Sequence, residues 1–260
     1  MADAWGMMYG ETKAKICARD WRLSGWLVSA RWISQPPKCQ WLPEGAFRSP
    51  QIEGVSRGYN LPMQPARELE VEDPLTLFDA WMKDAQQREL NDPNAAALAT
   101  CTAEGQPSVR MVLVRQVGER RFAFFTNAGS RKGRELAENA KAAICFHWKS
   151  LRRQVRAEGS VAELPAAEVD KYFHSRSRAS QIGAAVSLQS QVLSSRQELE
   201  ARVRAYTEDH PGEIPRPDFW RGFYVEPARI EFWIDGAHRL HDRILFTRDG
   251  DGWQKARLYP

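Results

Sequence analysis

The chain has 260 residues, with 37 lysines and arginines against 33 acidic residues, and this formal net charge of +4 is too small to indicate a general nucleic-acid-binding surface. The four cysteines lie far apart in the sequence, which argues against a disulfide framework and a zinc site and favours a reducing cytoplasm. No apolar run approaches the roughly 20 residues of a membrane-spanning helix, so we expect no integral membrane protein.

Residues 1–66 differ in composition from the rest of the chain. They hold five of the ten tryptophans, interleaved with Arg and Lys, and Pro36, Pro37 and Pro43 interrupt any regular period. We therefore expect a poorly ordered amino-terminal extension. The apolar run Gly25–Val28 is too short for a secretory signal. An organellar targeting segment, which the acidic residues here argue against, and a start assigned too far upstream remain alternatives.

The ordered domain is expected over residues 67–260 and should open with an amphipathic helix. Asp73 can cap this helix, Pro74 suits its first turn, and apolar residues follow at helical spacing as far as Ala85. Three further helices are predicted from caps and apolar spacing, at residues 130–139, 165–172 and 194–206.

Short apolar runs separated by turn residues predict the strands of an antiparallel sheet. The runs are Ala96–Thr102, Val109–Val117, Arg121–Thr126, Ala142–Trp148, Gln154–Leu164, Gly222–Val225, Arg229–Ile234, Ile244–Thr247 and Trp253–Leu258. Because the helices interrupt these strands irregularly and do not alternate with them, a mainly β barrel is favoured over a doubly wound sheet.

The segment Thr126–Gly133 combines a strand end, a turn and a helix start with two adjacent cations, Arg131 and Lys132. The first turn of a helix offers free backbone N–H groups and a partial positive charge, which suit a phosphate monoester. This segment is therefore a candidate phosphate site. A solvated helix start with ordinary surface charges is the alternative.

Tyr172, Arg176 and Ser180 are spaced four residues apart, so on one helix their polar groups would share a face. Charge-assisted hydrogen bonds from such a face would favour a phosphorylated ligand. We interpret the three residues as a second anion site, with a solvated polar helix face as the alternative.

The run Arg239–Arg243 follows Trp233 after a short gap and places two guanidiniums and an imidazole close to an aromatic ring. On an extended segment, Arg239 and His241 would point the same way and could hold a flat ligand. A histidine side chain titrates near neutral pH, so His241 is a candidate for proton transfer. A surface turn in which these side chains pair with neighbouring carboxylates is the alternative.

Taken together, Ser130–Gly133, Tyr172–Arg176 and Arg239–Arg243 resemble the motifs of the pyridoxine/pyridoxamine 5'-phosphate oxidase family, and the resemblance runs from Asp73 to Pro260. It implies an FMN-binding split antiparallel β-barrel with flanking helices, working as a homodimer with flavin sites at the subunit interface. It also implies oxidation of phosphorylated B6 vitamers by FMN, with dioxygen as the acceptor and hydrogen peroxide as a product. Motifs for dinucleotide, P-loop and zinc-protease chemistry are absent, so we expect no metal.

The resemblance also assigns roles to single residues. FMN contacts are implied for Arg110, Met111, Val112, Leu113, Phe125, Thr126, Arg131, Lys132, Gln154, Gln189, Ser190, Trp233 and Arg243. Substrate contacts are implied for Arg115, Tyr172, Arg176, Ser180, Arg239 and His241, with the last two as the catalytic pair. Arg115 stands where the family has lysine, which keeps the charge but changes the geometry of a phosphate contact. Ser177 and Arg221 replace the family's usual proline and glycine without removing a contact.

Three other functions stay open at this point. A related flavin oxidase of phenazine biosynthesis would share the barrel but should lack the Tyr172, Arg176 and Ser180 set. A non-catalytic module that binds flavin or carries pyridoxal phosphate is the second alternative. A weak nucleic-acid binder would use the basic amino-terminal region, and its affinity would collapse in salt.

Overall fold

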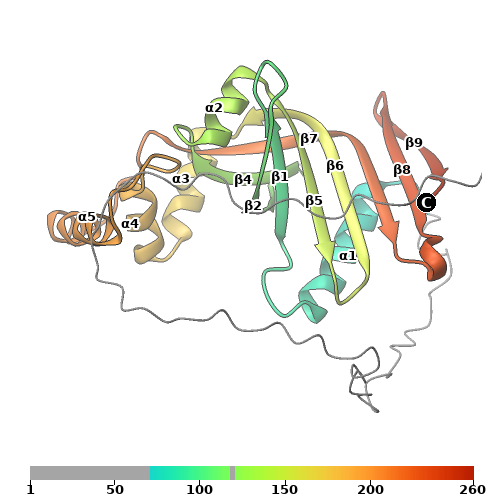
Figure 1. The fold of residues 1–260 in the computed structure, drawn as a ribbon, viewed down its shortest axis with the longest axis horizontal. Coiled ribbons are helices and arrows are strands. Elements are labelled where there is room, and N and C mark those ends of the chain that lie inside the picture. The colour runs from blue at the N-terminus through green and yellow to red at the C-terminus, as the bar shows by residue number, and fades with distance from the viewer. Residues whose placement is uncertain (1–70, 118–120) are drawn as a thin grey trace, which may run out of the picture. The chain divides into compact units, whose positions relative to one another are not determined.

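A computed structural model describes residues 71–117 and 121–260. The expected extension over residues 1–66 and the expected start of the domain at residue 67 lie outside the described residues. Within these residues, nine strands form one curled antiparallel sheet with helices beside it, and this mainly β fold confirms the expected class (Figure 1). None of the helices in this part of the chain is both long and apolar enough to cross a membrane.

The strands pair in the order β2-β1-β5-β6-β7-β4-β3, while β8 pairs with β7 and β9 with β8. Their bounds are β1 Ala95–Cys101, β2 Pro107–Leu113, β3 Arg115–Val117, β4 Arg121–Asn127, β5 Lys141–Trp148, β6 Arg153–Glu163, β7 Trp220–Ile234, β8 Asp242–Asp249 and β9 Gly252–Leu258. All expected strands are present, and β3 is separated from β2 by a single residue.

Strand β7 organises the sheet because it pairs with three other strands. Along one edge it pairs with β6, from Phe223 to Ile234. On the other edge, β4 pairs with Trp220–Val225 and β8 pairs with Arg229–Ile234. The two ends of β7 therefore support different parts of the molecule.

The sequence predicts two strands, Gly222–Val225 and Arg229–Ile234, where the structure has the single strand β7. Pro227 between them cannot donate a backbone hydrogen bond, and the register with β6 shifts at a bulge beside Gly159. A Cβ on Gly159 would lie 1.9 Å from the carbonyl oxygen of Glu226. Only glycine fits this close approach, and it allows β7 to continue past the proline.

Five α-helices flank the sheet in the described part of the chain. Their bounds are α1 Pro74–Arg88, α2 Arg131–Glu138, α3 Ala166–Ser175, α4 Arg178–Val186 and α5 Arg196–Asp209. The expected caps are confirmed: Asp73 accepts from the backbone N–H groups of Leu75 and Thr76, and Ser130 accepts from that of Gly133. These side chains fix where α1 and α2 begin.

The helix expected at residues 165–172 corresponds to α3, but a second helix, α4, follows it that the sequence did not indicate. Arg176 lies between the two with an extended backbone, φ −80° and ψ 155°. Ser177 then caps α4 by accepting from the N–H of Ser180 at 3.3 Å. The expectation that Tyr172, Arg176 and Ser180 share one helix face is therefore wrong.

Two apolar clusters hold the fold together. The larger joins α1 to one face of the sheet, where Phe78 packs on Phe122 and Phe146 with ring centroids 4.9 and 5.1 Å away. Trp81 packs edge-on against Phe232 at 5.1 Å. The smaller cluster joins α3 and α4 to the end of the sheet that carries β4.

The other face of the sheet has an apolar patch at its β2 edge. Val109, Met111 and Leu113 are exposed there, beside half-buried alanines of β1. Exposed apolar side chains that lie together in this way are typical of an interaction surface.

Candidate functional site

Lys132 is buried at the start of α2, where β4 ends. It is 8% exposed, and its Nζ donates to Gln189 Oε1 at 2.9 Å, Thr126 Oγ at 3.2 Å and Ser130 Oγ at 3.4 Å. Burial, followed by the nearby Arg110 guanidinium, lowers the pKa of Lys132. Among the described residues, this ammonium has only neutral hydrogen-bond partners, so it is suited to an anionic ligand.

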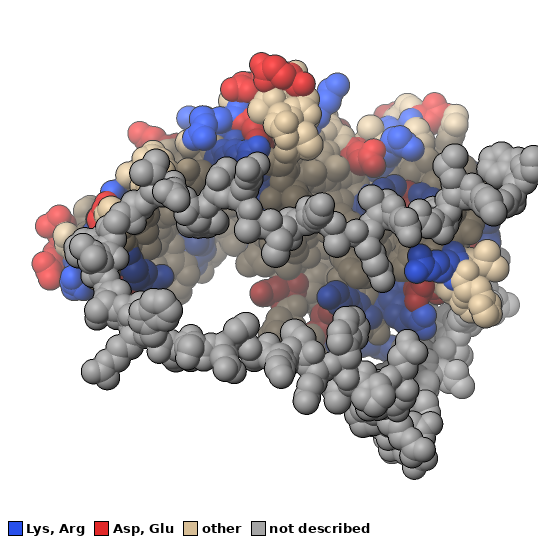
Figure 2. All heavy atoms as spheres, viewed as in Figure 1, with Lys and Arg blue, Asp and Glu red and all other residues tan. Residues whose placement is uncertain are grey.

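The start of α2 is tightly packed against the preceding turn. A Cβ on Gly133 would lie 2.2 Å from the carbonyl oxygen of Ala128, so glycine is required for this approach. The backbone N–H of Arg131 donates to Ser190 Oγ at 3.1 Å. Figure 2 shows basic side chains gathered around α2 on the face in view. The helix N-terminus, its cations and the Ser190 loop therefore form one positive cluster.

Arg110 reaches this cluster from β2. Its guanidinium donates to side chains of β1 and β2 and lies 3.4 Å from Glu135 Oε2. The next three residues of β2 are placed differently. Met111 and Leu113 are exposed on the open sheet face, and Val112 packs against the core. Of this run, only the Arg110 side chain enters the cluster.

Arg176, at the break between α3 and α4, provides a second, half-buried positive charge. Its Nη1 is buried without a hydrogen-bond partner in the described part of the chain, and its Cζ lies 5.1 Å from the centre of the Trp220 ring. Burial lowers the pKa of Arg176. A cavity of about 380 Å³ is lined by Arg176, Ser180, Thr126 and Gln189. The cavity therefore connects the surroundings of Lys132 with an unsatisfied guanidinium.

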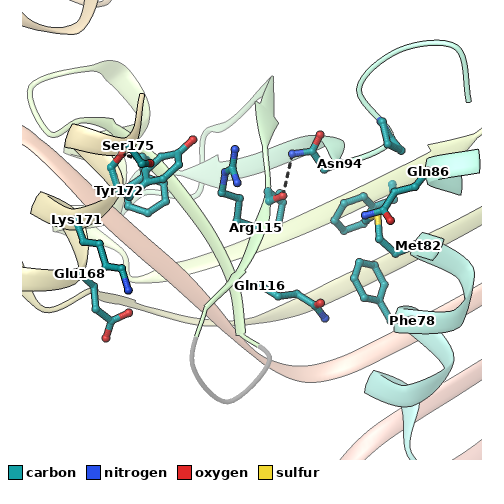
Figure 3. Close-up of a pocket in the computed structure, with 14 residues that line it drawn as sticks. Phe78, Met82, Gln86, Asn94, Arg115, Gln116, Glu168, Lys171, Tyr172 and Ser175 are labelled. Atoms are coloured by element: carbon teal, nitrogen blue, oxygen red, sulfur yellow. Dashed lines mark hydrogen bonds between the residues drawn. The ribbon is translucent and has the colours of Figure 1, made fainter. Parts of the chain in front are cut away.

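Arg115 and Tyr172 line a larger cavity of about 820 Å³ between α1 and α3 (Figure 3). The Cζ of Arg115 lies 4.7 Å from the centre of the Tyr172 ring, and Figure 3 shows Arg115 between Tyr172 and Asn94. Phe125 packs against Tyr172 with the rings tilted by 35° at a centroid distance of 4.0 Å, and it lines both cavities. Arg115 and Tyr172 thus face one cavity and Arg176 the other, with Phe125 as the shared wall.

A third cluster lies where β7 ends and β8 begins. The ring of Trp233 lies 4.6 Å from that of His241, and its cross-strand neighbours are Gln154 on β6 and Arg243 on β8. Arg243 donates from Nε and Nη2 to the two carboxylate oxygens of Glu231, at 2.8 and 3.1 Å. The Arg243 side chain is thereby held beside the indole on the open face of the sheet.

The sequence predicts that Arg239 and His241 lie on an extended segment, and the structure contradicts this. Ala237–Arg239 form a short 3-10 turn, η2, in which Arg239 has a left-handed backbone with φ 65°. Arg239 is exposed, whereas His241 Nδ1 lies 3.1 Å from both the N–H of Gly236 and Oδ1 of Asp235. The expectation that Arg239 and His241 point the same way because they lie two residues apart on an extended segment is therefore wrong.

Strand β7 separates the cluster around Trp233 and His241, the third cluster, from the first two, which are the positive cluster at α2 and the surroundings of Arg176. Trp220, which packs on Arg176, and Trp233 are 13 residues apart on this strand, which is about 40 Å at the rise of a β-strand. One chain therefore brings the candidates around Lys132 and Arg176 together, but it does not bring Arg239 to them. The candidates at the distant end are Gln154, Trp233, Arg239, His241 and Arg243.

Sequence reasoning misses two residues of the site, Glu135 and Trp220. Glu135 accepts a hydrogen bond from Arg131, four residues earlier on α2, at 2.9 Å. That spacing is a recognisable signal for a helical ion pair. Trp220 stacks on Phe125 at 5.3 Å and lies under Arg176. No local pattern marks it, because these contacts come from distant parts of the chain.

The fold and its cationic clusters place the chain in a class, the FMN-binding split-barrel proteins. PhzG from Burkholderia lata, solved in complex with tetrahydrophenazine-1-carboxylic acid, aligns with a TM-score of 0.71 at 32% identity, over 75% of this chain and 96% of that one. A pyridoxamine 5'-phosphate oxidase-related, FMN-binding protein from Nostoc punctiforme aligns with a TM-score of 0.60 at 16% identity, over 73% of this chain and all of that one, which supports the fold alone.

Sequence comparisons narrow this class to one family. Residues 82–208 match the family described as Pyridoxamine 5'-phosphate oxidase, and residues 220–260 match the Pyridoxine 5'-phosphate oxidase C-terminal dimerisation region. The pyridoxine/pyridoxamine 5'-phosphate oxidase of Gluconobacter oxydans is 56% identical over 189 residues, 72% of this chain and 94% of the relative. That of Rhodospirillum rubrum is 54% identical over 198 residues, covering 74% and 98%. The chain belongs to the pyridoxine/pyridoxamine 5'-phosphate oxidase family.

Proposed function

We propose that this protein is an FMN-dependent oxidase that converts pyridoxamine 5'-phosphate and pyridoxine 5'-phosphate to pyridoxal 5'-phosphate. Membership of the family supports this activity. The observation that carries the proposal is a pair of cations, the buried Lys132 and the half-buried Arg176, which lack an anionic hydrogen-bond partner among the described residues. Arg176 lines a cavity that reaches the Lys132 partners Thr126 and Gln189. Two phosphate groups, one from FMN and one from the substrate, would supply the missing anions.

The positive cluster at α2 fits the phosphate of FMN. Lys132, Arg131 and Arg110 supply charge, and the first turn of α2 supplies backbone N–H groups. Thr126 and Gln189 carry polar groups from this cluster into the cavity. When bound, FMN would accept a hydride from the substrate carbon that bears the amine or alcohol, while a proton leaves the amine or hydroxyl group. The alcohol would give the aldehyde directly, whereas the imine formed from the amine would be hydrolysed by water with release of ammonia. Dioxygen would reoxidise the flavin and give hydrogen peroxide.

Arg176 is assigned to the substrate phosphate, together with Arg115 and Tyr172, which line the neighbouring cavity across the shared wall of Phe125. Charge-assisted hydrogen bonds contribute about 1.5 to 3 kcal/mol each, so these side chains would select a phosphorylated vitamer over the free alcohol. The planar guanidinium of Arg115 stacks on Tyr172. This contact orients the guanidinium and explains how arginine can serve where the family has lysine.

Arg239 and His241 are assigned to the vitamer ring and to proton transfer. Contacts with Gly236 and Asp235 engage Nδ1 of His241 and fix its ring against Trp233. Nε2 of His241 would then hold or release the proton. Arg239, on the exposed η2 turn, would position the pyridine ring.

A homodimer with flavin sites between its subunits completes the proposal. The third cluster lies about 40 Å from the first two along β7, so the same cluster of a second copy would have to complete each site. The match of residues 220–260 to a dimerisation region supports this arrangement. The exposed apolar patch of Val109, Met111 and Leu113 provides a surface for the contact.

A phenazine-type flavin oxidase is the second candidate, because the fold and 32% of the aligned residues agree with PhzG of Burkholderia lata. Tetrahydrophenazine-1-carboxylic acid, the ligand in that structure, carries no phosphate. Nη1 of Arg176, which is buried without a hydrogen-bond partner among the described residues, therefore favours a phosphorylated vitamer as the substrate of this chain.

Purified protein tests the proposal directly. We expect a flavin absorption spectrum and release of hydrogen peroxide on addition of pyridoxamine 5'-phosphate, with far less from unphosphorylated pyridoxamine as the matched control. A protein that cannot be reconstituted with FMN, or a flavoprotein inert towards both phosphorylated vitamers, would contradict the proposal. Oxidation of a reduced phenazine carboxylate instead would favour the second candidate.

A further inference from the structure

Glu135 lies in the middle of the positive cluster at α2, although the ligand proposed there is itself an anion. Glu135 is only 3% exposed. Oε1 accepts a hydrogen bond from Arg131 Nε at 2.9 Å, and Oε2 accepts from Thr100 Oγ and Ser108 Oγ, each at 2.5 Å. Oε2 also lies 3.4 Å from Arg110 Nη2. One carboxylate thus contacts two guanidiniums and two hydroxyls.

The two hydroxyls link Arg110 to Glu135 in one defined direction. Arg110 Nη1 donates to Thr100 Oγ at 2.6 Å, and Arg110 Nη2 donates to Ser108 Oγ. A hydroxyl that accepts from a guanidinium has a single proton to donate, and here both protons go to Glu135 Oε2. The orientation of the Arg110 guanidinium therefore depends on an acceptor with several free lone pairs at position 135.

The carboxyl group of Glu135 is ionised at neutral pH. Burial opposes ionisation, but hydrogen bonds from Ser108, Thr100 and Arg131, with the charge of Arg110, outweigh burial and lower the pKa of Glu135 to about 2. The negative charge is therefore a permanent part of the cluster.

Glu135 also sets the charge of the cluster. Arg110, Arg131 and Lys132 carry three positive charges and Glu135 carries one negative charge, so the formal sum is +2, which matches a phosphate dianion. Burial and the charge of Arg110 lower the pKa of Lys132, whereas Glu135 acts in the opposite direction. The carboxylate therefore offsets repulsion among cations that must be held together before a ligand arrives.

We propose that Glu135 is a positioning residue for the FMN phosphate site. Its carboxylate holds the guanidiniums of Arg110 and Arg131 in the orientation that binds the phosphate. The inference rests on the proposed FMN site and adds a residue that does not itself contact the cofactor. The contribution of Glu135 should be confined to the phosphate, because its contacts are with the phosphate cluster and not with the cavity beyond it.

Riboflavin, which has the same ring system without the phosphate, separates this role from a general structural one. We expect Glu135→Gln to raise the Kd of the full-chain apoprotein for FMN about tenfold or more. Loss of a residue that orients metal ligands has an effect of this size on metal affinity. The Kd for riboflavin should stay within about twofold, since neutral contacts dominate there. Both constants are measured by flavin fluorescence quenching. Glu138→Gln, an exposed substitution on the same helix, is the matched control and should change neither.

A double-mutant cycle distinguishes a positioning role of Glu135 from a general loss of folding. Ser108→Ala removes one of the hydroxyl links and should weaken FMN binding in the same selective way, though less than Glu135→Gln. In an Arg110→Ala background, Glu135→Gln should have a clearly smaller effect on FMN affinity, because the side chain that it positions is gone. Additive effects of the two substitutions would overturn the proposal.

Other outcomes also overturn it. Equal losses of FMN and riboflavin affinity, with a lower Tm, would assign Glu135 a structural role, and unchanged or tighter FMN binding would remove the role altogether. Failure of the proposed function gives a different result. Wild-type protein that binds FMN much more tightly than riboflavin but oxidises no vitamer leaves this inference intact, whereas wild-type protein without preference for FMN overturns both.

Discussion

The two ends of β7 differ in how much of a site one chain completes. At the Trp220 end, Lys132 and Glu135 are buried and hydrogen-bonded to side chains from other strands and loops. At the Trp233 end, Arg239 is exposed on a short turn, and the contacts of His241 are local. One end is therefore preorganised for an anion within a single chain, whereas the other is proposed to be completed by a second copy.

Because of this difference, we expect FMN affinity and the rate of turnover to depend on different residues. Preorganised cations bind a phosphate without first being ordered by the ligand, so the Trp220 end should control how tightly FMN is held. Arg239 and His241, which are assigned to the substrate and not to FMN, should instead control turnover of bound substrate. Substitutions of the cations at α2 and substitutions of Arg239 are therefore expected to have opposite signatures.

The largest effect is expected from Arg131→Ala combined with Lys132→Ala. Each residue supplies a charge-assisted hydrogen bond worth about 1.5 to 3 kcal/mol, so FMN affinity should fall about a hundredfold or more. Flavin content after purification and titration of the apoprotein measure the loss. Arg134→Ala removes an exposed charge from the same helix and should leave the flavin bound.

Arg239→Ala should lower turnover of pyridoxamine 5'-phosphate while FMN stays bound. A misplaced substrate ring can cost about a hundredfold in rate, so a fall of roughly tenfold to a hundredfold is expected. Steady-state kinetics with the flavin spectrum recorded on the same sample checks both parts. Loss of FMN here, with FMN retained in the Arg131 and Lys132 variant, would show that the two assignments are exchanged.

Arg176→Met should weaken substrate binding while it stabilises the folded protein. KM for the phosphorylated vitamer should rise about tenfold, since a charged phosphate contact is lost. The free energy of unfolding should increase by about 1 kcal/mol, because a buried guanidinium nitrogen without a partner is replaced by an apolar side chain. Urea unfolding of the apoprotein measures the second effect. Lower stability with an unchanged KM would contradict the assignment of Arg176.

A further prediction concerns acid stability. The pKa of Glu135 in the folded protein is about 2, below its ordinary value of 4.5, so its stabilising contribution is complete above the ordinary value and is lost as pH falls towards 2. Glu135→Gln has no group that titrates in this window. The difference in unfolding free energy between wild type and this variant should therefore shrink as pH falls from about 4.5 towards 2. A difference that stays constant across this window would indicate that the carboxylate is not held in this way.

Features encoded by adjacent residues could be predicted from the sequence. The starts of α1 and α2 follow from the side chains of Asp73 and Ser130, which bond to N–H groups two or three residues later. The position of Lys132 at a helix start follows in the same way. These contacts are local, so short sequence patterns contain all that determines them.

Features that depend on distant contacts could not be predicted. A continuous β7 requires Gly159 of another strand to accommodate the backbone at Glu226. The break at Arg176 arises because Ser177 caps a new helix, although the spacing of polar residues suggested that the first would continue. Likewise, the two hydroxyl partners of Glu135, Ser108 and Thr100, lie 27 and 35 residues away in the chain. No periodicity within a segment reveals such pairs.

The close approach of Gly159 to β7 also limits how the chain can change in length. Side chains alternate between the two faces of a strand, so inserting or deleting one residue between Val225 and Arg229 would turn Glu231 and Trp233 to the opposite face. The number of residues between Trp220 and Trp233 on β7 can therefore change only in steps of two if both side chains are to stay on their present faces. A family that varies freely in its surface loops should keep the length of this strand constant.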